Sequence, residues 1–270
     1  MKRNLVLAFS FLILIPTVFN CRRTSDVSAR PGQLWKPKEG TSETGGFPDE
    51  IIWLKDGAEM VLVASGEFLY GEQKEPRTLA SFYMDKYPVT NERYHKFIKA
   101  TGHRAPYLDE AVARPFNWKR SKHPKGKEKC PVVLVDWYDA AAFCRWAGKT
   151  LPTEEQWEKT ARGTDGRAYP WGDEFDEKKC NSWLTGVETI TPVDRFVSGA
   201  SPYGCLDMAG NVWEWTSTRK NGLYVLRGGS FFEGDVFVRC YTTDKFRPWA
   251  RPDSKKVNGG FRSCYILPER

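Results

Sequence analysis

Residues 147–158 read AGKTLPTEEQWE, and this stretch marks where one helix ends and the next begins. Gly148 suits the left-handed backbone that commonly ends a helix. Pro152 helps to fix the entry of the following helix. Thr153 and Gln156 form a capping box, in which each side chain satisfies an exposed amide of the other residue. The sequence therefore predicts two helices joined by a short linker.

The segments before this stretch predict further short elements. A helix is expected from Asp136 to Ala147, because its apolar residues recur on one face. Another is expected from Asn91 to Ala100, with Thr90 as its cap. Short apolar runs bounded by turn residues indicate strands, at residues 60–63, 66–71 and 81–85.

The half of the chain beyond Arg162 is rich in Gly, Pro, Asn, Asp and Trp, and it has few long periodic segments. Such a composition excludes a helical bundle. Loop backbone leaves many polar groups that packing, disulfides or ions must satisfy. The 11 Trp, 11 Tyr and 16 Phe supply enough apolar surface for one core. We therefore expect one α+β domain whose second half consists mainly of loops.

Seven short motifs carry a resemblance to a known family. They are FYMDKYPVTN (82–91), PVVLVDW (131–137), AGKTLPTEEQWE (147–158), YPWGD (169–173), GNVWEW (210–215), RGGS (227–230) and GGFR (259–262). Together, and in this order, they resemble the formylglycine-generating enzyme (sulfatase-modifying factor) family. The resemblance implies that family's C-type-lectin-like α+β fold, which is rich in loops and has little regular secondary structure.

The resemblance also implies an activity that the sequence contradicts. Catalytic members of the family use dioxygen and a copper ion held by two cysteines to oxidise a cysteine of a sulfatase segment to formylglycine. Here Glu233 and Val238 stand where the two cysteines would be. Neither a carboxylate nor an isopropyl group is a useful ligand for Cu(I), which prefers thiolates. No copper is therefore expected, and the leading hypothesis is a non-catalytic binding or scaffold role.

The alternative is an atypical oxidase, or a formylglycine-generating type of enzyme that acts on an exported protein. Cys240 is the nearest thiol to the replaced pair, and Glu233 and Asp235 are possible ligands or bases. Cys240 is read mainly as a structural thiol, and the two carboxylates as part of a solvated turn. A related branch that binds iron needs three clustered histidines, and the three histidines of this chain are scattered, at His95, His103 and His123.

Calcium is the cofactor that the resemblance implies, at two structural sites with oxygen ligands. The first set comprises the side chains of Asn181 and Asp194 and the carbonyls of Ser182 and Phe196. The second comprises the side chains of Asp207 and Glu214 and the carbonyls of Gly210 and Val212. The same residues alternatively cap turns without any metal.

The N-terminus predicts export. Residues 1–20 combine a basic start with an apolar run, as in a signal peptide. Cys21 follows directly, and the arrangement resembles a bacterial lipoprotein in which this thiol is lipidated. Residues 21–49 then read as a flexible tether and residues 50–270 as the domain. The alternatives are an uncleaved anchor or an exported protein with a free thiol.

Export places the remaining six cysteines where disulfides persist. The family pattern implies a bridge between Cys144 and Cys264, although Cys264 is displaced by one residue because GFRSC stands in place of GFRC. The partners of the other four stay open.

The net charge of +7 is concentrated partly in one segment, residues 114–129. This segment reads as a solvated loop, or else as a patch that meets an anionic surface, and no nucleic-acid motif accompanies it. We therefore predict a membrane-anchored lipoprotein of the periplasm or the cell surface, whose partner is an envelope protein, a peptide or a glycan.

Overall fold

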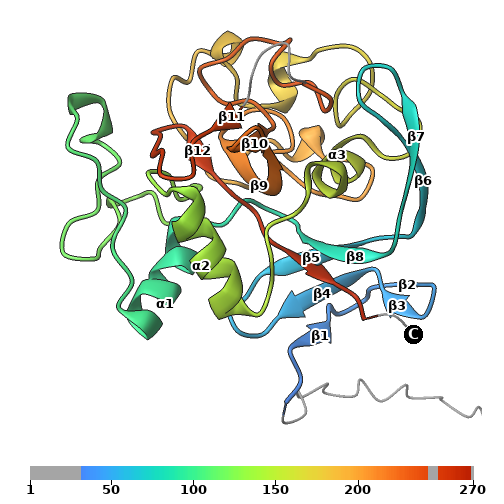
Figure 1. Ribbon diagram of the computed structural model, residues 1–270, viewed down its shortest axis with the longest axis horizontal. Coiled ribbons are helices and arrows are strands. Elements are labelled where there is room, and N and C mark those ends of the chain that lie inside the picture. The colour runs from blue at the N-terminus through green and yellow to red at the C-terminus, as the bar shows by residue number, and fades with distance from the viewer. Residues whose placement is uncertain (1–31, 243–248, 269–270) are drawn as a thin grey trace, which may run out of the picture.

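The first sheet joins both ends of the domain. The structure is a computed structural model that describes residues 32–242 and 249–268. Five strands follow the order β1-β4-β5-β8-β13, all antiparallel (Figure 1). They are β1 (Trp35–Pro37), β4 (Glu50–Trp53), β5 (Glu59–Val63), β8 (Phe82–Asp85) and β13 (Cys264–Ile266). The last strand comes from the C-terminal end of the domain and pairs with β8, so this sheet contains strands from both ends of the domain.

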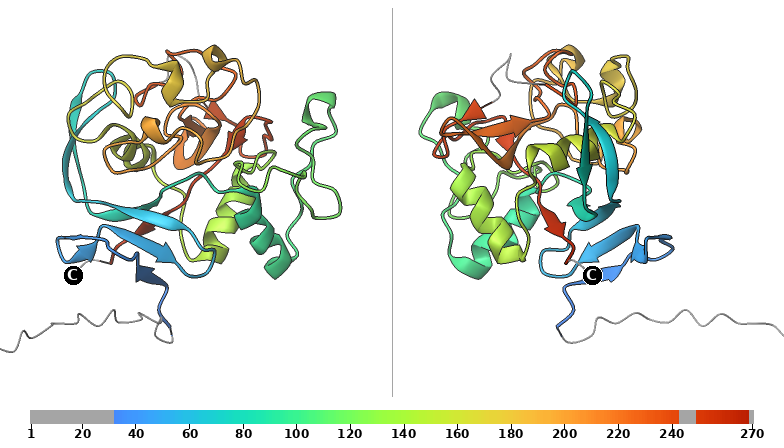
Figure 2. Two further views of the ribbon diagram at one scale, coloured as in Figure 1. Left: turned by 180° about the vertical axis from the view of Figure 1, so that it is seen from behind. Right: turned by 45° about the vertical axis from the view of Figure 1, so that its right-hand side comes forward.

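The second sheet lies in the loop-rich half and has the order β11-β10-β9-β12. Its strands are β9 (Trp213–Lys220), β10 (Leu223–Arg227), β11 (Trp249–Ala250) and β12 (Gly259–Gly260). Two hairpins complete the strands, β2 (Glu43–Thr44) with β3 (Phe47–Pro48) and β6 (Gly66–Tyr70) with β7 (Glu75–Leu79). The two views of Figure 2 show the two sheets in different parts of the molecule.

The three α-helices confirm the caps that the sequence predicts. They are α1 (Asn91–Thr101), α2 (Trp137–Ala147) and α3 (Glu154–Arg162). Thr90 caps α1, and capping boxes begin α2 at Asp136 and α3 at Thr153. Short 3₁₀ turns lie at η1 (Ala111–Ala113), η2 (Glu177–Lys179), η3 (Trp183–Thr185) and η4 (Val197–Gly199).

Aromatic side chains join the helices to the C-terminal segment. Tyr94 of α1 stacks on Phe143 of α2, with ring centroids 5.8 Å apart, and Phe143 meets Phe261 at 5.4 Å. The indole of Trp53 in β4 donates to the carbonyl of Ala147 at 2.7 Å, which ties the first sheet to the end of α2. The core therefore combines residues from widely separated parts of the chain.

A buried ionic cluster holds the first sheet against the helices. Arg93 contacts Asp56 at 2.6 Å and Asp85 at 2.8 Å, and Lys149 contacts the same two carboxylates at 2.9 and 3.0 Å. Burial alone would raise the pKa of Asp56, but Arg93 and Lys149 lower it below its usual range. The two cations therefore compensate two carboxylates that have no access to water.

The folded region begins earlier than the sequence predicts. Trp35–Pro37 pair with Ile51–Trp53 in the first sheet, so the predicted boundary at residue 50 is too late. The segment from Trp35 to Pro37 is too short to give a strand signal of its own, and the strand forms because β4 offers it an edge.

Residues 1–20 and Cys21, the predicted signal peptide and lipidation site, lie outside the described residues. Within the described ranges, no helix has the length and apolar character needed to cross a membrane.

The predicted bridge between Cys144 and Cys264 is wrong in this structure. All six cysteines of the described residues are free and buried. Cys144 packs in the cluster around Phe143, whereas Cys264 lies in another cluster with Trp157 and Met84.

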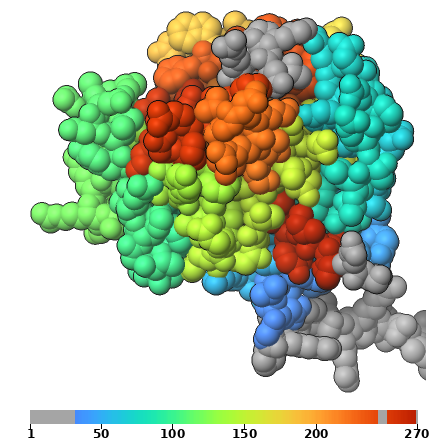
Figure 3. Space-filling view, in the orientation of Figure 1, coloured from blue at the N-terminus to red at the C-terminus, as the bar shows by residue number. Residues whose placement is uncertain are grey.

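Residues 104–129 form an arm beside α1, which we call the basic arm (Figures 1 and 3). Trp118 and Phe116 are buried and anchor the arm to the body. The backbone of Lys119 and Lys122 closes a tight turn at its end, with hydrogen bonds of 3.0 Å in both directions. Its basic side chains are exposed or half-buried, as a solvated loop requires.

Replacing Lys149 with Met should destabilise the fold by about 3–5 kcal/mol, because it leaves a buried carboxylate without a countercharge. Denaturant unfolding of the full chain would measure the change. Lys125→Met in the basic arm is the matched control and should change the free energy of unfolding by less than about 0.5 kcal/mol. Equal stability of the two variants would contradict the role assigned to the cluster.

Candidate functional site

The site begins at a turn that only glycine permits. Gly229 follows β10 with φ of +71°, and a Cβ there would lie 2.8 Å from the carbonyl oxygen of Phe237 and from Val238. The side-chain-free backbone lets the loop from Ser230 to Cys240 pack back against the turn. As a result, Glu233 lies over the start of β9.

The carboxylate of Glu233 is held on both sides. The indole nitrogen of Trp213 donates to its Oε1 at 3.0 Å, and the hydroxyl of Ser230 donates to its Oε2. Asn258 donates to the Ser230 hydroxyl at 3.0 Å, so that hydroxyl is itself oriented. The backbone carbonyl of Glu233 accepts from the amide of Trp183 at 2.9 Å. Glu233 is therefore a fixed anionic group at the surface.

Val238 lies in the protein interior. It is fully buried against Tyr169, Cys180 and Ala209. An aliphatic side chain in this environment contributes packing and offers no metal ligand. The two positions at which the family resemblance places a copper-binding cysteine pair thus hold a surface carboxylate and a core valine.

The structure does not assemble the weak catalytic candidates into one site. Cys240 is fully buried near Cys205 and Met208, and burial raises the pKa of its thiol far above the usual range. Asp235 is half-exposed and lies 3.8 Å from Arg239. A reactive cysteine needs access and a lowered pKa, so Cys240 is a structural thiol.

Comparison with known proteins agrees with this geometry. The model of the sulfatase-modifying factor enzyme 1-like domain matches residues 53–265. The chain belongs to the sulfatase-modifying factor family.

Members of both catalytic and inactive type resemble it to a similar degree. The chain is 33% identical over 236 residues to the inactive C-alpha-formylglycine-generating enzyme 2 of Bos taurus, covering 68% of this chain and 77% of the relative. It is 34% identical over 245 residues to the formylglycine-generating enzyme of Streptomyces coelicolor, covering 68% and 78%. Overall sequence identity therefore does not distinguish catalytic from inactive members of the family. The residues at the site have to make that distinction.

The solved structure of PvdO from Pseudomonas aeruginosa has the same fold. The superposition gives a TM-score of 0.65 at 23% identity and covers 79% of this chain and 96% of PvdO. This agreement, with the mixed sheets and short helices described above, confirms the predicted loop-rich α+β fold of the sulfatase-modifying factor family.

The first predicted calcium set fits in part. The side-chain oxygen of Asn181 is buried and has no hydrogen-bond partner, as the ligand of a hard cation would be. The side chain of Asp194, in contrast, is 47% exposed and contacts Lys129 at 3.2 Å. The carbonyls of Ser182 and Phe196 accept the turn hydrogen bonds of Thr185 and Gly199. In this set, therefore, only the side-chain oxygen of Asn181 is buried without a hydrogen-bond partner.

The second predicted calcium set does not fit as a whole. Both carboxylate oxygens of Glu214 are engaged by Arg262, each at 2.7 Å, and Trp157 donates to one of them at 2.8 Å. The carbonyl of Gly210 accepts from the amide of Val212 at 2.9 Å. Asp207 retains one buried oxygen without a partner. The sequence gives no indication that the guanidinium of Arg262 forms an ion pair with the carboxylate of Glu214.

Asn211 joins the two unmet oxygens into one polar network. Its amide donates to Asp207 at 2.7 Å, and its oxygen accepts from Asn181 at 3.2 Å. The buried hydroxyl of Thr191 also lacks a hydrogen-bond partner. Within residues 32–242 and 249–268, however, no three His, Cys, Asp or Glu side chains are grouped as a metal site would require. Calcium at this network stays a prediction.

The three histidines do not converge on one point. His95 and His123 lie with ring centroids 5.8 Å apart, whereas His103 contacts Asp139 at 2.8 Å. The arrangement is the one expected of surface histidines that pack against neighbouring rings and carboxylates.

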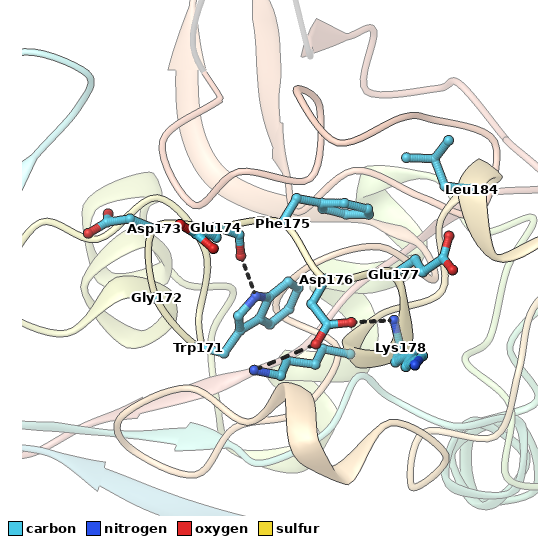
Figure 4. Close-up of a pocket in the computed structure, with 10 residues that line it drawn as sticks. Trp171, Gly172, Asp173, Glu174, Phe175, Asp176, Glu177, Lys178 and Leu184 are labelled. Atoms are coloured by element: carbon cyan, nitrogen blue, oxygen red, sulfur yellow. Dashed lines mark hydrogen bonds and ion pairs between the residues drawn. The ribbon is translucent and has the colours of Figure 1, made fainter.

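Sequence reasoning missed a surface hollow of about 690 Å³, which we call the acidic hollow (Figure 4). Its lining combines apolar, acidic and basic side chains: Trp171, Phe175 and Leu184, then Asp173, Glu174, Asp176 and Glu177, and finally Lys178 and Lys179. Part of it belongs to the YPWGD motif at 169–173, which the sequence marks for the family without indicating a cavity.

Asp207 should make stability depend on pH when calcium is absent. Burial raises its pKa to about 7 from the usual 3.8, so the folded state binds a proton that the unfolded state releases above pH 4. Its contribution to the free energy of unfolding is therefore fully present below pH 4 and is lost as the pH rises to 7, by an amount of the order of 4 kcal/mol.

Denaturant unfolding of wild type and Asp207→Asn in EDTA, at several pH values from 4 to 8, would measure this term. The variant should gain stability relative to wild type as the pH rises through this window. A constant difference between the two proteins would show that Asp207 has an ordinary pKa.

Proposed function

We propose that the chain is an exported, lipid-anchored protein whose sulfatase-modifying factor domain binds a segment of an envelope partner and does not oxidise cysteine. The single observation that carries this proposal is the pair of replacements at the site. Glu233 is fixed as a carboxylate by Trp213 and Ser230, and Val238 is buried in the core. Copper-thiolate chemistry has no ligand at either position.

The surface beside Glu233 supports a binding role. Trp183 is 55% exposed and Phe232 is 43% exposed, and the backbones of Trp183 and Glu233 are joined by a hydrogen bond of 2.9 Å. Exposed aromatic rings beside a fixed carboxylate suit a binding surface, because aromatic residues are enriched among those that contribute most to binding at protein interfaces. We call the surface formed by Trp183, Phe232 and Glu233 the aromatic face.

The N-terminal residues support the anchor. A basic start, an apolar run and Cys21 form the arrangement of an exported lipoprotein. The described fold begins with β1 at Trp35, so the stretch from Cys21 to this strand would separate the lipid from the domain. The described cysteines are buried and free, and they therefore neither support nor oppose an oxidising compartment.

No specific observation favours the alternative oxidase. The candidate thiol Cys240 is buried with a raised pKa, and Asp235 is engaged by Arg239. An enzyme of this kind would need a substrate-accessible redox group that the site residues do not supply.

The copper assay tests the proposal directly. The full chain in detergent, supplied with copper and dioxygen, should produce no formylglycine from a cysteine-containing sulfatase peptide, whereas a catalytic formylglycine-generating enzyme assayed beside it should turn over. Mass spectrometry of the peptide would measure the loss of mass from thiol to aldehyde. Formylglycine from the wild-type chain would overturn the proposal, and its loss in Cys240→Ala would assign the activity to that thiol.

We also propose that calcium, when bound, stabilises the network around Asn181 and Asp207. The support is the pair of buried oxygens without partners on these residues. Calcium should raise the melting temperature relative to EDTA by roughly 5–10 °C at a hundredfold excess over the dissociation constant, and magnesium should have little effect.

Asn181→Ala should lose most of this calcium shift, whereas Asn221→Gly in the exposed turn between β9 and β10 should keep it. Differential scanning fluorimetry with calcium and with EDTA measures both. Identical melting temperatures of the wild type under the two conditions would refute the site.

A further inference from the structure

The acidic hollow differs in charge from the rest of the chain. Its lining carries four carboxylates and two ammonium groups, while the whole chain has a net charge of +7. Asp173 accepts from the amide of Ala168 at 3.0 Å, and Asp176 accepts from that of Lys178 at 2.9 Å. Glu174 and Glu177 form no ion pair with any side chain of the described residues. These two carboxylates therefore have no ion-pair partner among the described side chains, and the four carboxylates of the lining outnumber its two ammonium groups.

An aromatic ring in the hollow is rigidly placed. Trp171 stacks on Tyr169, with ring centroids 5.5 Å apart and planes at 9°. Its indole nitrogen donates to the carbonyl of Glu174 at 2.9 Å, which Figure 4 shows as a dashed line. Because stacking and this hydrogen bond both fix the ring, the hollow exists before any ligand arrives.

The ring already has a cation beside it. The ammonium of Lys179 lies 5.9 Å from the centroid of Trp171, within the range of cation–π attraction. The same ammonium is 3.9 Å from Asp176, in a side chain that is 31% exposed. Trp171 and Asp176 thus already have one ammonium group beside them, which shows that the hollow can accommodate a cation next to its aromatic ring.

The hollow continues into the aromatic face. Leu184 lines the hollow, and its neighbour Trp183 is exposed and bonded through its backbone amide to Glu233. Because Trp183 and Leu184 are adjacent in the chain, the hollow and the aromatic face are neighbouring surfaces that one extended segment of a partner can contact.

We propose that the acidic hollow binds a lysine or arginine side chain of the partner segment that crosses the aromatic face. This inference rests on the proposed binding function and adds the chemistry of the partner. A neutral sugar could stack on the ring of Trp171 but could not form ion pairs with the carboxylates. A cationic side chain can make a cation–π contact with the ring and ion pairs with the carboxylates. The hollow of about 690 Å³ has room for such a side chain and part of its backbone.

Two capped peptides test the proposal, Ala-Ala-Arg-Ala-Ala and its counterpart with citrulline, which has nearly the same shape without the charge. Isothermal titration calorimetry with the full chain in detergent at low salt would measure both. The arginine peptide should bind about tenfold more tightly than the citrulline peptide, and its affinity should fall as salt screens the carboxylates. No heat of binding for the arginine peptide at millimolar concentration would overturn the proposal.

Matched variants locate the effect. Glu174→Gln combined with Glu177→Gln should weaken binding of the arginine peptide about tenfold and leave the citrulline peptide unchanged. Glu39→Gln combined with Glu110→Gln removes the same charge from exposed positions outside the hollow and should leave both peptides unchanged. Equal weakening by the two double variants would show a general charge effect and refute the hollow as the site.

The outcomes also separate this inference from the proposed function. If both peptides bind equally, and Trp183→Ala weakens both, the cation site is refuted and the binding role of the aromatic face stands. If the chain produces formylglycine in the copper assay, the proposed function fails whatever the peptides do.

Discussion

The fold depends on one buried guanidinium. Arg262 contacts both oxygens of Glu214 at 2.7 Å. It also donates to the carbonyls of four residues in two other segments, Asp85, Lys86, Leu206 and Asp207, at 2.8 to 3.3 Å. A buried charge is tolerated only when it is paired and its remaining protons are satisfied. Arg262 meets both conditions by drawing the C-terminal segment, β8, β9 and the loop before β9 together.

This arrangement explains how the site can change its chemistry within a constant fold. Trp213 and Glu214 are consecutive residues of β9, so their side chains point to opposite faces. Glu214 points towards Arg262 and Trp157, whereas Trp213 points towards Glu233. The identity of the residue at position 233 therefore affects only the outer face of the strand. The inner face, which the fold requires, is untouched.

The distribution of charge follows a similar division. The buried carboxylates Asp56, Asp85 and Glu158 have arginine or lysine partners within 3.0 Å. The carboxylates of Glu174 and Glu177, at the surface hollow, have none among the described residues. A buried carboxylate needs a cationic partner or, like Asp207, has a raised pKa, because an unpaired ion loses its hydration on burial. Uncompensated charge is thus available for recognition only where water reaches it.

The sequence by itself determined the elements that depend on neighbouring residues. The capping box of Thr153 and Gln156, the cap at Thr90 and the stop at Gly148 are local hydrogen bonds and local backbone preferences, and the structure has all of them. The ordered motifs also determined the family, and the absence of a cysteine pair at Glu233 and Val238 is visible in the sequence alone.

Only the tertiary structure decided the long-range pairings. It placed β1 on the edge of β4, left Cys144 and Cys264 unbridged, paired Glu214 with Arg262 and formed a hollow around Trp171. Each of these outcomes depends on which distant segments meet and on which face a side chain then points. Local propensity carries no information about either, because a shift of one residue in an extended segment reverses the face.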